Sequence, residues 1–167
     1  MTNSEVPSET GHTGVLFGTG ARALQDELDT RRLADVLAQF TVHDELTDDD
    51  RQLVAAQSTV WISTVDADGW PDVSYKGGTP GFVEVAGPRE LRIPSYDGNG
   101  MMRTLGNISD TGRVALLFID QSRPWRLRVH GTARISLDPT DVERHHGAEA
   151  VIIITIGRLF PIRPSNR

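Results

Sequence analysis

Residues 126–135 carry the clearest pattern in the sequence, a strict alternation of apolar and polar side chains. One set is Leu127, Val129, Gly131, Ala133 and Ile135, and the set between them is Arg126, Arg128, His130, Thr132 and Arg134. Successive side chains of a strand point to opposite faces, so this pattern predicts a strand with one face in the core. Arginines along one face repel each other. One explanation of the row is an external negative charge, from a bound anion or a partner's carboxylates. The other is pairing with the many acidic residues of this chain. The sequence favours neither explanation.

A pair of strands is predicted over residues 61–81, joined by a turn at Asp68-Gly69. Glycine in such a turn adopts the positive φ that a tight hairpin needs. The return strand ends at Lys76, which two glycines follow, and this arrangement lets a ligand approach the backbone beside a positive charge. A solvated lysine on a surface hairpin is the simpler interpretation, and this stretch alone favours it.

The remaining pattern predicts a mainly β chain with some helices. Further strands are expected at residues 81–85, 90–94, 113–119 and 149–160. Sixteen Gly and nine Pro suit many turns better than a helical bundle. We therefore predict a closed or partly closed barrel of six to seven mostly antiparallel strands with helical cover.

Helices are predicted before and between these strands. Apolar residues recur at helical spacing over residues 21–40, which predicts one helix or two in succession. Thr47 and Asp50 predict a capping box for the next helix, and Asp138-Pro139 predicts the start of a short one. Residues 1–20 are expected to be mobile, and residues 21–167 to form a single domain.

The connection after Pro94 is rich in glycine and asparagine, and we predict that a short helix begins near Asn99. Free N–H groups at a helix N-terminus bind phosphate, and Gly98 and Gly100 would let that phosphate come close. Asp97 argues against an anion here, because its carboxylate can cap the helix itself.

Composition excludes several classes of function. The chain has 167 residues, a net charge of −6 and no cysteine, so we expect no nucleic-acid binding, no disulfide and no zinc–thiolate site. No apolar run approaches the length of a membrane span and no signal peptide is evident, so we predict a cytoplasmic protein without membrane contact.

Two short motifs do not predict a site. His145-His146 lacks a third ligand, so no metal is expected. Residues 18–23 spell a G-x-G-x-x-A dinucleotide motif, but no strand-helix-strand context surrounds it.

Four strings in a fixed order give the sequence a family resemblance. They are VDADGWPDVSYKGGTPGFV, DGN followed by LGNI, ALLFID, and RLRVHG. In this order they resemble the pyridoxamine 5′-phosphate oxidase-like family, the FMN-binding split barrels, over roughly residues 21–160. The resemblance implies a split barrel, bound FMN (or deazaflavin F420 or haem, as in relatives) and a homodimer with the cofactor at the subunit interface.

The resemblance also implies which residues bind the cofactor. In the family, a strand ending in lysine lies along the flavin ring, a strand-to-helix turn holds the ring edge and phosphate, and a strand of the second subunit completes the site. Carried onto this chain, these segments give Val73, Ser74, Tyr75 and Lys76, then Pro94, Ser95, Asn99 and Gly100, then Arg126 and Arg128.

The chain also departs from the oxidases proper. It has Gly98-Asn99-Gly100 where they carry Ser-Arg-Lys, and it lacks their C-terminal Trp…Arg-Leu-x-Pro signature. The resemblance therefore implies an FMN-dependent oxidoreductase of an unknown small substrate rather than an oxidase of pyridoxamine phosphate. The alternatives are a non-catalytic flavin-binding or storage protein and a dimeric module with no cofactor. No catalytic residue is predicted, and Lys76 is the candidate positive group near the flavin or substrate.

Overall fold

The computed structural model describes residues 16–96 and 98–162 of the chain. In order along these residues lie α1 (Thr19–Glu27), α2 (Arg31–Thr41), α3 (Asp48–Ala56), β1 (Thr59–Val65), β2 (Pro71–Gly77), β3 (Glu84–Gly87), β4 (Glu90–Tyr96), α4 (Arg103–Thr111), β5 (Arg113–Ile119), β6 (Arg126–Ser136), α5 (Pro139–Val142) and β7 (Ala148–Ile162).

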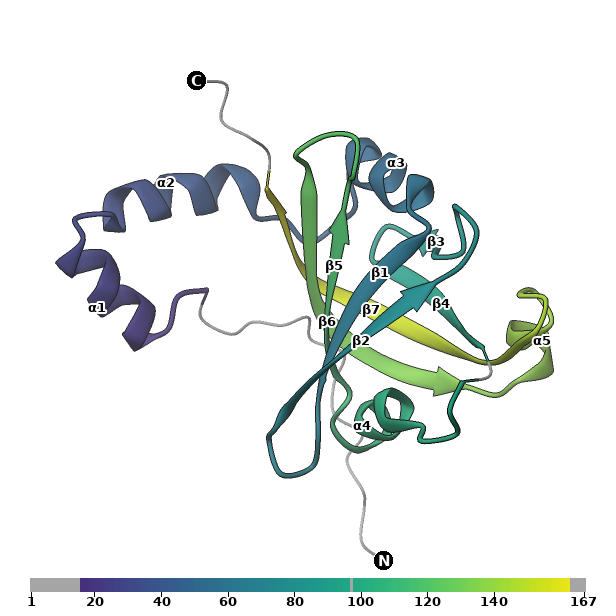
Figure 1. Ribbon diagram of the computed structural model, residues 1–167. Helices are drawn as coiled ribbons and strands as arrows, with labels where there is room; N and C mark the ends of the chain where they lie inside the picture. The colour runs from purple at the N-terminus through teal and green to yellow at the C-terminus, as the bar shows by residue number, and fades with distance from the viewer. Residues whose placement is uncertain (1–15, 97, 163–167) are drawn as a thin grey trace, which may run out of the picture.

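All seven strands form one antiparallel sheet in the order β2-β1-β5-β6-β7-β4-β3. The sheet is not closed, because β2 and β3 have no strand neighbour on their outer sides among the described residues. It curls around the core, with α3 and α4 toward opposite ends (Figure 1). The predicted mainly β fold with six to seven mostly antiparallel strands is confirmed.

The core lies on the inner face of the curled sheet. Alternate residues of the strands are buried there, as Leu127 and Val129 are on β6, while Arg126 and Arg128 on the same strand are exposed. The predicted alternation is thus confirmed. A register shift follows between His130 and Gly131 in the pairing with β7.

The hairpin predicted around Asp68-Gly69 is confirmed. β1 pairs with β2 from Thr59↔Gly77 to Val65↔Pro71, and Gly69 has a φ of 89°. The carboxylate of Asp66 accepts hydrogen bonds from the backbone N–H groups of Asp68 and Trp70, at 3.0 and 2.8 Å.

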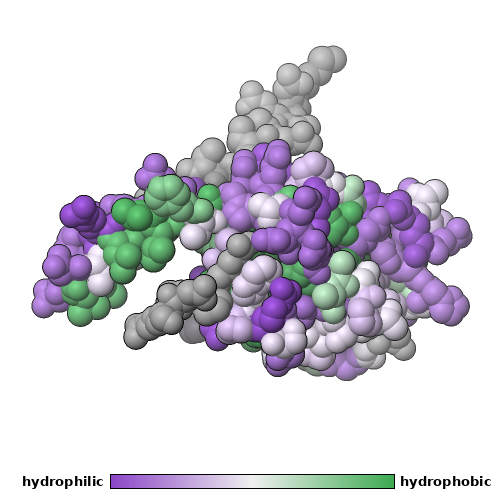
Figure 2. Space-filling model, turned by 90° about the horizontal axis from the view of Figure 1, so that it is seen from above, coloured by the Kyte–Doolittle hydropathy of each residue, from purple (hydrophilic) through white to green (hydrophobic). Residues whose placement is uncertain are grey.

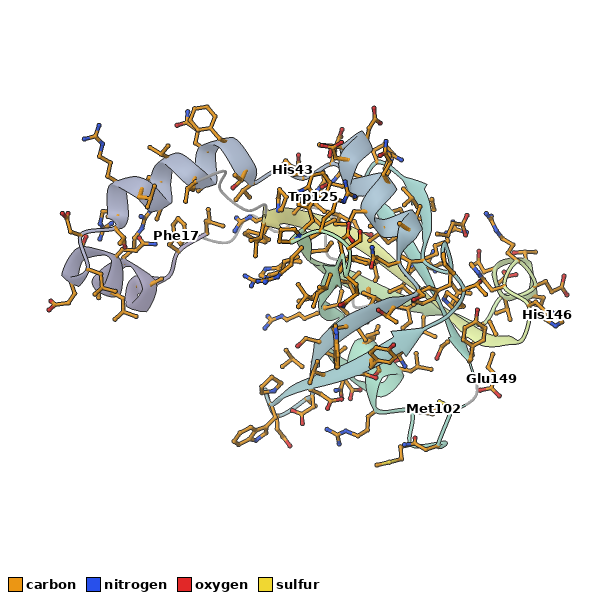
Figure 3. All side chains as sticks on the ribbon, turned by 45° about the horizontal axis from the view of Figure 1, so that its top comes forward. Phe17, His43, Met102, Trp125, His146 and Glu149 are labelled. Atoms are coloured by element: carbon orange, nitrogen blue, oxygen red, sulfur yellow. The ribbon has the colours of Figure 1, made fainter. Side chains whose placement is uncertain are left out.

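The helices α1 and α2 form a projecting arm, which we define as residues Thr19–Thr41. It extends away from the sheet, and His43 lies where α2 meets the barrel (Figure 1, Figure 3). The sequence allowed one helix or two here, and the structure has two, separated at Asp29 with a φ of 51°. Neither helix has a buried residue.

Residues 1–15 lie outside the described part of the chain, so the expected mobility of residues 1–20 falls mostly beyond it. Thr19 and Gly20 belong to α1. The G-x-G-x-x-A spelling thus runs into a helix, and no strand precedes it in residues 16–18.

The predicted helix caps are also present. Thr47 and Asp50 form a capping box at α3, and the Asp138 carboxylate accepts a hydrogen bond from Thr140 N–H at the start of α5. Of the helices in the described residues, none has the length and apolar character that crossing a bilayer requires.

Candidate functional site

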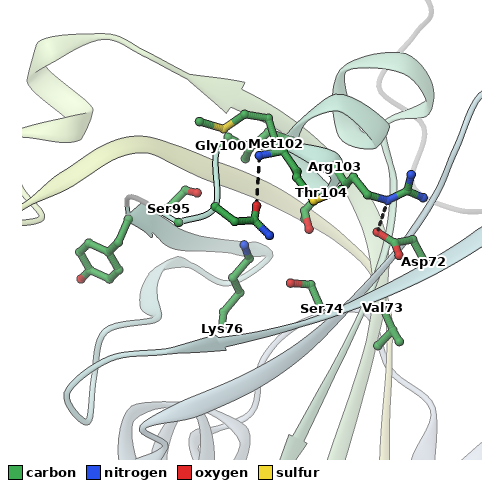
Figure 4. A pocket seen from close by; sticks show the side chains of 14 residues that line it. Asp72, Val73, Ser74, Lys76, Ser95, Gly100, Met102, Arg103 and Thr104 are labelled. Atoms are coloured by element: carbon green, nitrogen blue, oxygen red, sulfur yellow. Dashed lines mark hydrogen bonds and ion pairs between the residues drawn. The ribbon is translucent and has the colours of Figure 1, made fainter.

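A cavity of about 260 Å³ lies between β2 and the connection from β4 to α4. Figure 4 shows the side chains around it. The lining residues are Asp72, Val73, Ser74, Lys76, Ser95, Tyr96, Gly98, Asn99, Gly100, Met101, Met102, Arg103, Thr104 and Leu105.

β2 presents its polar side chains to this cavity. Ser74 pairs with Ile62 and Lys76 with Val60, and both β1 residues are fully buried, so Ser74 and Lys76 lie on the inner face of the sheet. Val73 and Tyr75 alternate with them and are exposed on the opposite face. β2 is also an edge strand, so half of its backbone N–H and C=O groups have no partner strand.

Lys76 is the cation at the centre of this arrangement. Its side chain is half-buried, and this burial lowers the pKa of its ammonium group below the usual value. Among the described residues, no oxygen accepts a hydrogen bond from this ammonium group and no carboxylate pairs with it. A half-buried charge without a counter-charge is costly. Lys76 is therefore placed to bind an anion.

The connection after β4 differs from the prediction. The helix begins at Arg103 rather than near Asn99, because Gly100 (φ 71°) and Met102 (φ 51°) take left-handed conformations that a right-handed helix cannot include. Asn99 lies in the connection, where its side-chain oxygen accepts a 3.1 Å hydrogen bond from Met101 N–H. The predicted capping role of Asp97 falls on a residue outside the described part of the chain.

The N-terminus of α4 faces the same cavity. Met102 occupies the capping position without a side-chain hydrogen bond to the helix, and Arg103, Thr104 and Leu105 form the first turn. Their N–H groups have no partner within the helix and lie at its positive end. All three residues line the cavity. An ammonium group and free N–H donors thus converge on one space, which suits a phosphate.

Two further side chains of α4 belong to this site. Thr104 is buried, and Arg103 Nε lies 3.7 Å from the Asp72 carboxylate on β2, joining the two walls of the cavity. Sequence reasoning missed both residues because it began the helix too early. No sequence signal would have found them, because the start of α4 is set by the left-handed backbone of Met102, which its residue type does not predict.

The predicted site residues fall into three groups. Lining the cavity are Val73, Ser74, Lys76, Ser95, Asn99 and Gly100. Pro94 is buried in β4 and does not line it. Tyr75, Arg126 and Arg128 lie on the opposite face of the sheet.

That opposite face, which we call the outer sheet face, holds a second hollow of about 660 Å³. Its lining residues are Trp61, Ser63, Val73, Ala115, Leu116, Leu117, Ile119, Arg128 and His130. The Trp61 and Tyr75 rings pack edge to face beside it, with centroids 5.2 Å apart. Val73 lines both hollows, so β2 separates the polar cavity from this apolar one.

The arginines predicted on one face of β6 are exposed on the outer sheet face. Within residues 16–96 and 98–162, Arg126, Arg128 and Arg134 have no acidic partner. Pairing with the chain's own carboxylates, one of the two explanations left open by the sequence, is therefore not seen there. In the same residues, no three His, Asp or Glu side chains come together as a metal-ligand set.

Comparisons with known proteins agree with this fold. The chain is 26% identical to a putative pyridoxamine 5′-phosphate oxidase from Lactobacillus delbrueckii, with a TM-score of 0.59 over 71% of this chain and 95% of that one. An FMN-binding protein from Syntrophomonas wolfei gives 12% identity and a TM-score of 0.55, covering 89% and 100% of the two chains. An F420 reductase gives 20% identity and a TM-score of 0.51, covering 68% and 98%.

No curated protein sequence matches the chain. The family model for pyridoxamine 5′-phosphate oxidase matches residues 46–158, which include β1 to β6, most of β7 and the whole polar cavity. The chain therefore belongs to the pyridoxamine 5′-phosphate oxidase family.

Proposed function

We propose that this protein binds FMN and is a flavin-dependent oxidoreductase acting on a small substrate. The observation that carries the proposal is the half-buried Lys76, which has no partner among the described residues and lines one cavity with the uncapped N-terminus of α4. A phosphate group satisfies both features at once, since it supplies the negative charge and several acceptor oxygens.

The residues at the cavity fit the phosphate end of such a cofactor. The Lys76 ammonium and the N–H groups of the first turn of α4 would hold the phosphate, with the hydroxyls of Ser74, Ser95 and Thr104 as further donors in the lining. No arginine or lysine is needed in the Gly98-Asn99-Gly100 turn, because Lys76 and Arg103 bring positive charge from β2 and α4. The residues that would bind the phosphate thus differ from those of the oxidases proper.

When bound, FMN supplies the redox chemistry, and the chain contributes position, charge and exclusion of water. Lys76 provides positive charge within the site, which favours any negative charge that develops there. The free edge of β2 offers backbone N–H and C=O groups to a planar polar ring.

The same proposal includes a homodimer. The polar cavity, at about 260 Å³, is below the roughly 300–1,000 Å³ of typical ligand pockets, so a single chain encloses only part of a flavin. The outer sheet face is apolar and carries Arg126 and Arg128 without acidic partners in the described residues. A second copy packed on this face would bury its apolar surface and bring those arginines toward the cofactor.

The visible absorption spectrum of the purified protein, followed by identification of the ligand released on denaturation, tests the cofactor. We expect a yellow protein that releases FMN and whose flavin is reduced by a nicotinamide donor and reoxidised by an acceptor. Release of the deazaflavin F420, after which one structural neighbour is named, would make F420 the cofactor instead of FMN. A Soret band in the spectrum would make haem the cofactor. Bound flavin that no donor reduces would instead indicate a binding or storage protein. A cytoplasmic location stays a prediction.

A further inference from the structure

We propose that the arm formed by α1 and α2 docks, through its apolar side chains, on a second copy of this chain. The inference rests on the homodimer of the proposed function and adds a contact surface outside the outer sheet face.

The arm exposes large apolar side chains that its own barrel does not cover. Between 45% and 80% of each of six side chains is exposed, namely Leu24, Leu28, Leu33, Val36, Leu37 and Phe40. Figure 2 shows this apolar surface on the projecting arm, seen from above. Single exposed apolar residues are ordinary, but a contiguous group on one element marks an interaction site.

The arm has little of its own to keep it folded. Its helices have 9 and 11 residues, and neither buries a side chain. Exposed ion pairs join parts of the arm, Arg22 to Asp35 at 2.7 Å and Arg31 to Asp26. Such pairs contribute little, and helices this short are marginal in water without tertiary packing. A partner surface is therefore needed to hold the arm in this form.

The position of the arm identifies that partner as a second copy. A hollow of about 620 Å³ joins Leu37 and Ala38 of α2 to Arg128, His130 and Phe160 of the sheet. Arg128 and His130 also line the hollow of the outer sheet face. The apolar surface of the arm is thus continuous with the face proposed as the dimer interface. In a two-fold dimer, each arm would reach across the rim of the interface to the other barrel.

In a two-fold dimer the arm contact occurs twice, once for each protomer. Both arms therefore bury their apolar residues, because the same patch is used on both sides of such an interface.

Two measurements on the full-length protein test the proposal. The first is hydrogen–deuterium exchange of the amides of α1 and α2 over a dilution series, alongside sedimentation to obtain the dimer dissociation constant. The second compares the wild type with the triple variant L33Q/L37Q/F40Q. A double variant on exposed polar positions of the same helix, R32Q/Q39E, is the matched control.

We expect the arm amides to be protected in the dimer and to lose protection on dilution in step with dissociation. The triple variant should raise the dimer dissociation constant by at least about tenfold, and the control should leave it within about twofold. Protection that does not change with concentration would overturn the proposal, because residues of the same chain would then cover the arm.

The outcome separates the arm from the proposed function. A wild-type dimer that binds FMN, with freely exchanging arm amides or an unaffected triple variant, overturns the arm contact alone. A monomeric wild type overturns both the arm contact and the proposed interface, and FMN titration of that monomer then reports on the cofactor separately.

Discussion

The side-chain amide of Asn107 on α4 donates a 2.9 Å hydrogen bond to the hydroxyl of Thr64 on β1, and both side chains are buried. On the same helix, the Thr111 hydroxyl donates a 2.9 Å bond to the Val65 carbonyl. These contacts fix α4 against the strand that pairs with β2. The N-terminus of α4 is thereby held where it lines one cavity with Lys76.

Replacing Asn107 with Ala should destabilise the fold by about 1–3 kcal/mol, because it leaves the buried Thr64 hydroxyl without its partner. FMN binding should also weaken, since α4 is no longer held at its present angle. Urea unfolding and flavin titration measure the two effects. Ser109→Ala is the control, because the Ser109 hydroxyl is exposed and bonds only to the Leu105 carbonyl within the helix. Equal stability of N107A and S109A would contradict the assigned role of the Asn107 contact.

Replacing Lys76 with Met should weaken FMN binding by about 10- to 100-fold, the equivalent of about 1.5–3 kcal/mol for a hydrogen bond to a charged group. Lys76→Arg keeps the charge and should retain more of the affinity. Fluorescence quenching of added FMN measures both variants. An FMN affinity of K76M equal to that of the wild type would remove Lys76 from the site.

The stability of the ligand-free protein should also depend on pH through Lys76. Burial lowers the pKa of Lys76 in the folded state, so between this lowered pKa and the ordinary 10.5 the unfolded chain binds more protons. The free energy of unfolding therefore increases as pH rises from the lowered pKa to 10.5. This increase is lost again as pH falls through the lowered pKa. K76M lacks this titration. Its stability advantage over the wild type at neutral pH should narrow as pH rises, and an advantage that stays constant would contradict the burial of a charged Lys76.

Gly131→Ala should destabilise the protein by more than about 3 kcal/mol, because an added Cβ would lie 2.2 Å from the Thr155 carbonyl oxygen across the β6–β7 pair. Gly106→Ala is the matched control. Nothing lies within 4 Å of a Cβ at Gly106, which is inside α4, so alanine should stabilise the helix by roughly 0.5–1 kcal/mol. Thermal unfolding of the two variants compares them directly. A G131A protein as stable as the wild type would mean that β6 and β7 separate more easily at this position than the close backbone approach implies.

Trp61→Gln should weaken dimerisation if the outer sheet face is the interface. Trp61 lines the apolar hollow of that face, whereas Trp70 lies beside the turn of the same hairpin and is 73% exposed. Trp70→Gln therefore removes the same side chain at a position outside the hollow and serves as the control. Sedimentation should show a dimer dissociation constant raised by at least about tenfold for W61Q alone. A dimer dissociation constant raised more by W70Q than by W61Q would place the interface elsewhere.

Much of the barrel could be predicted because its signals are local. The alternation along residues 126–135 and the Asp68-Gly69 turn each depend on neighbouring residues, and both are confirmed. The capping box of Thr47 and Asp50 is equally local. Such local patterns can be interpreted without knowing which other elements pack against the segment.

The site was harder to predict because it depends on backbone conformation and on distant contacts. The start of α4 follows from the left-handed backbone of Met102, a residue for which no sequence rule expects a positive φ. Strand alternation should have separated Tyr75 from Lys76, since the side chains of neighbouring residues in a strand point to opposite faces of the sheet. The helical spacing in the arm predicted one helix or two in succession but not the exposure of their apolar side chains, because spacing does not tell what a face packs against.

The most direct test of a phosphate site at Lys76 and α4 is a parallel titration of the cofactor-free protein with FMN and with riboflavin, which lacks the phosphate. FMN should bind at least about tenfold more tightly, equivalent to about 1.4 kcal/mol, and this preference should shrink in K76M, which keeps only the donors of α4 and the nearby hydroxyls. Equal affinity of the wild type for FMN and riboflavin, or binding of neither, would contradict a phosphate site in this cavity.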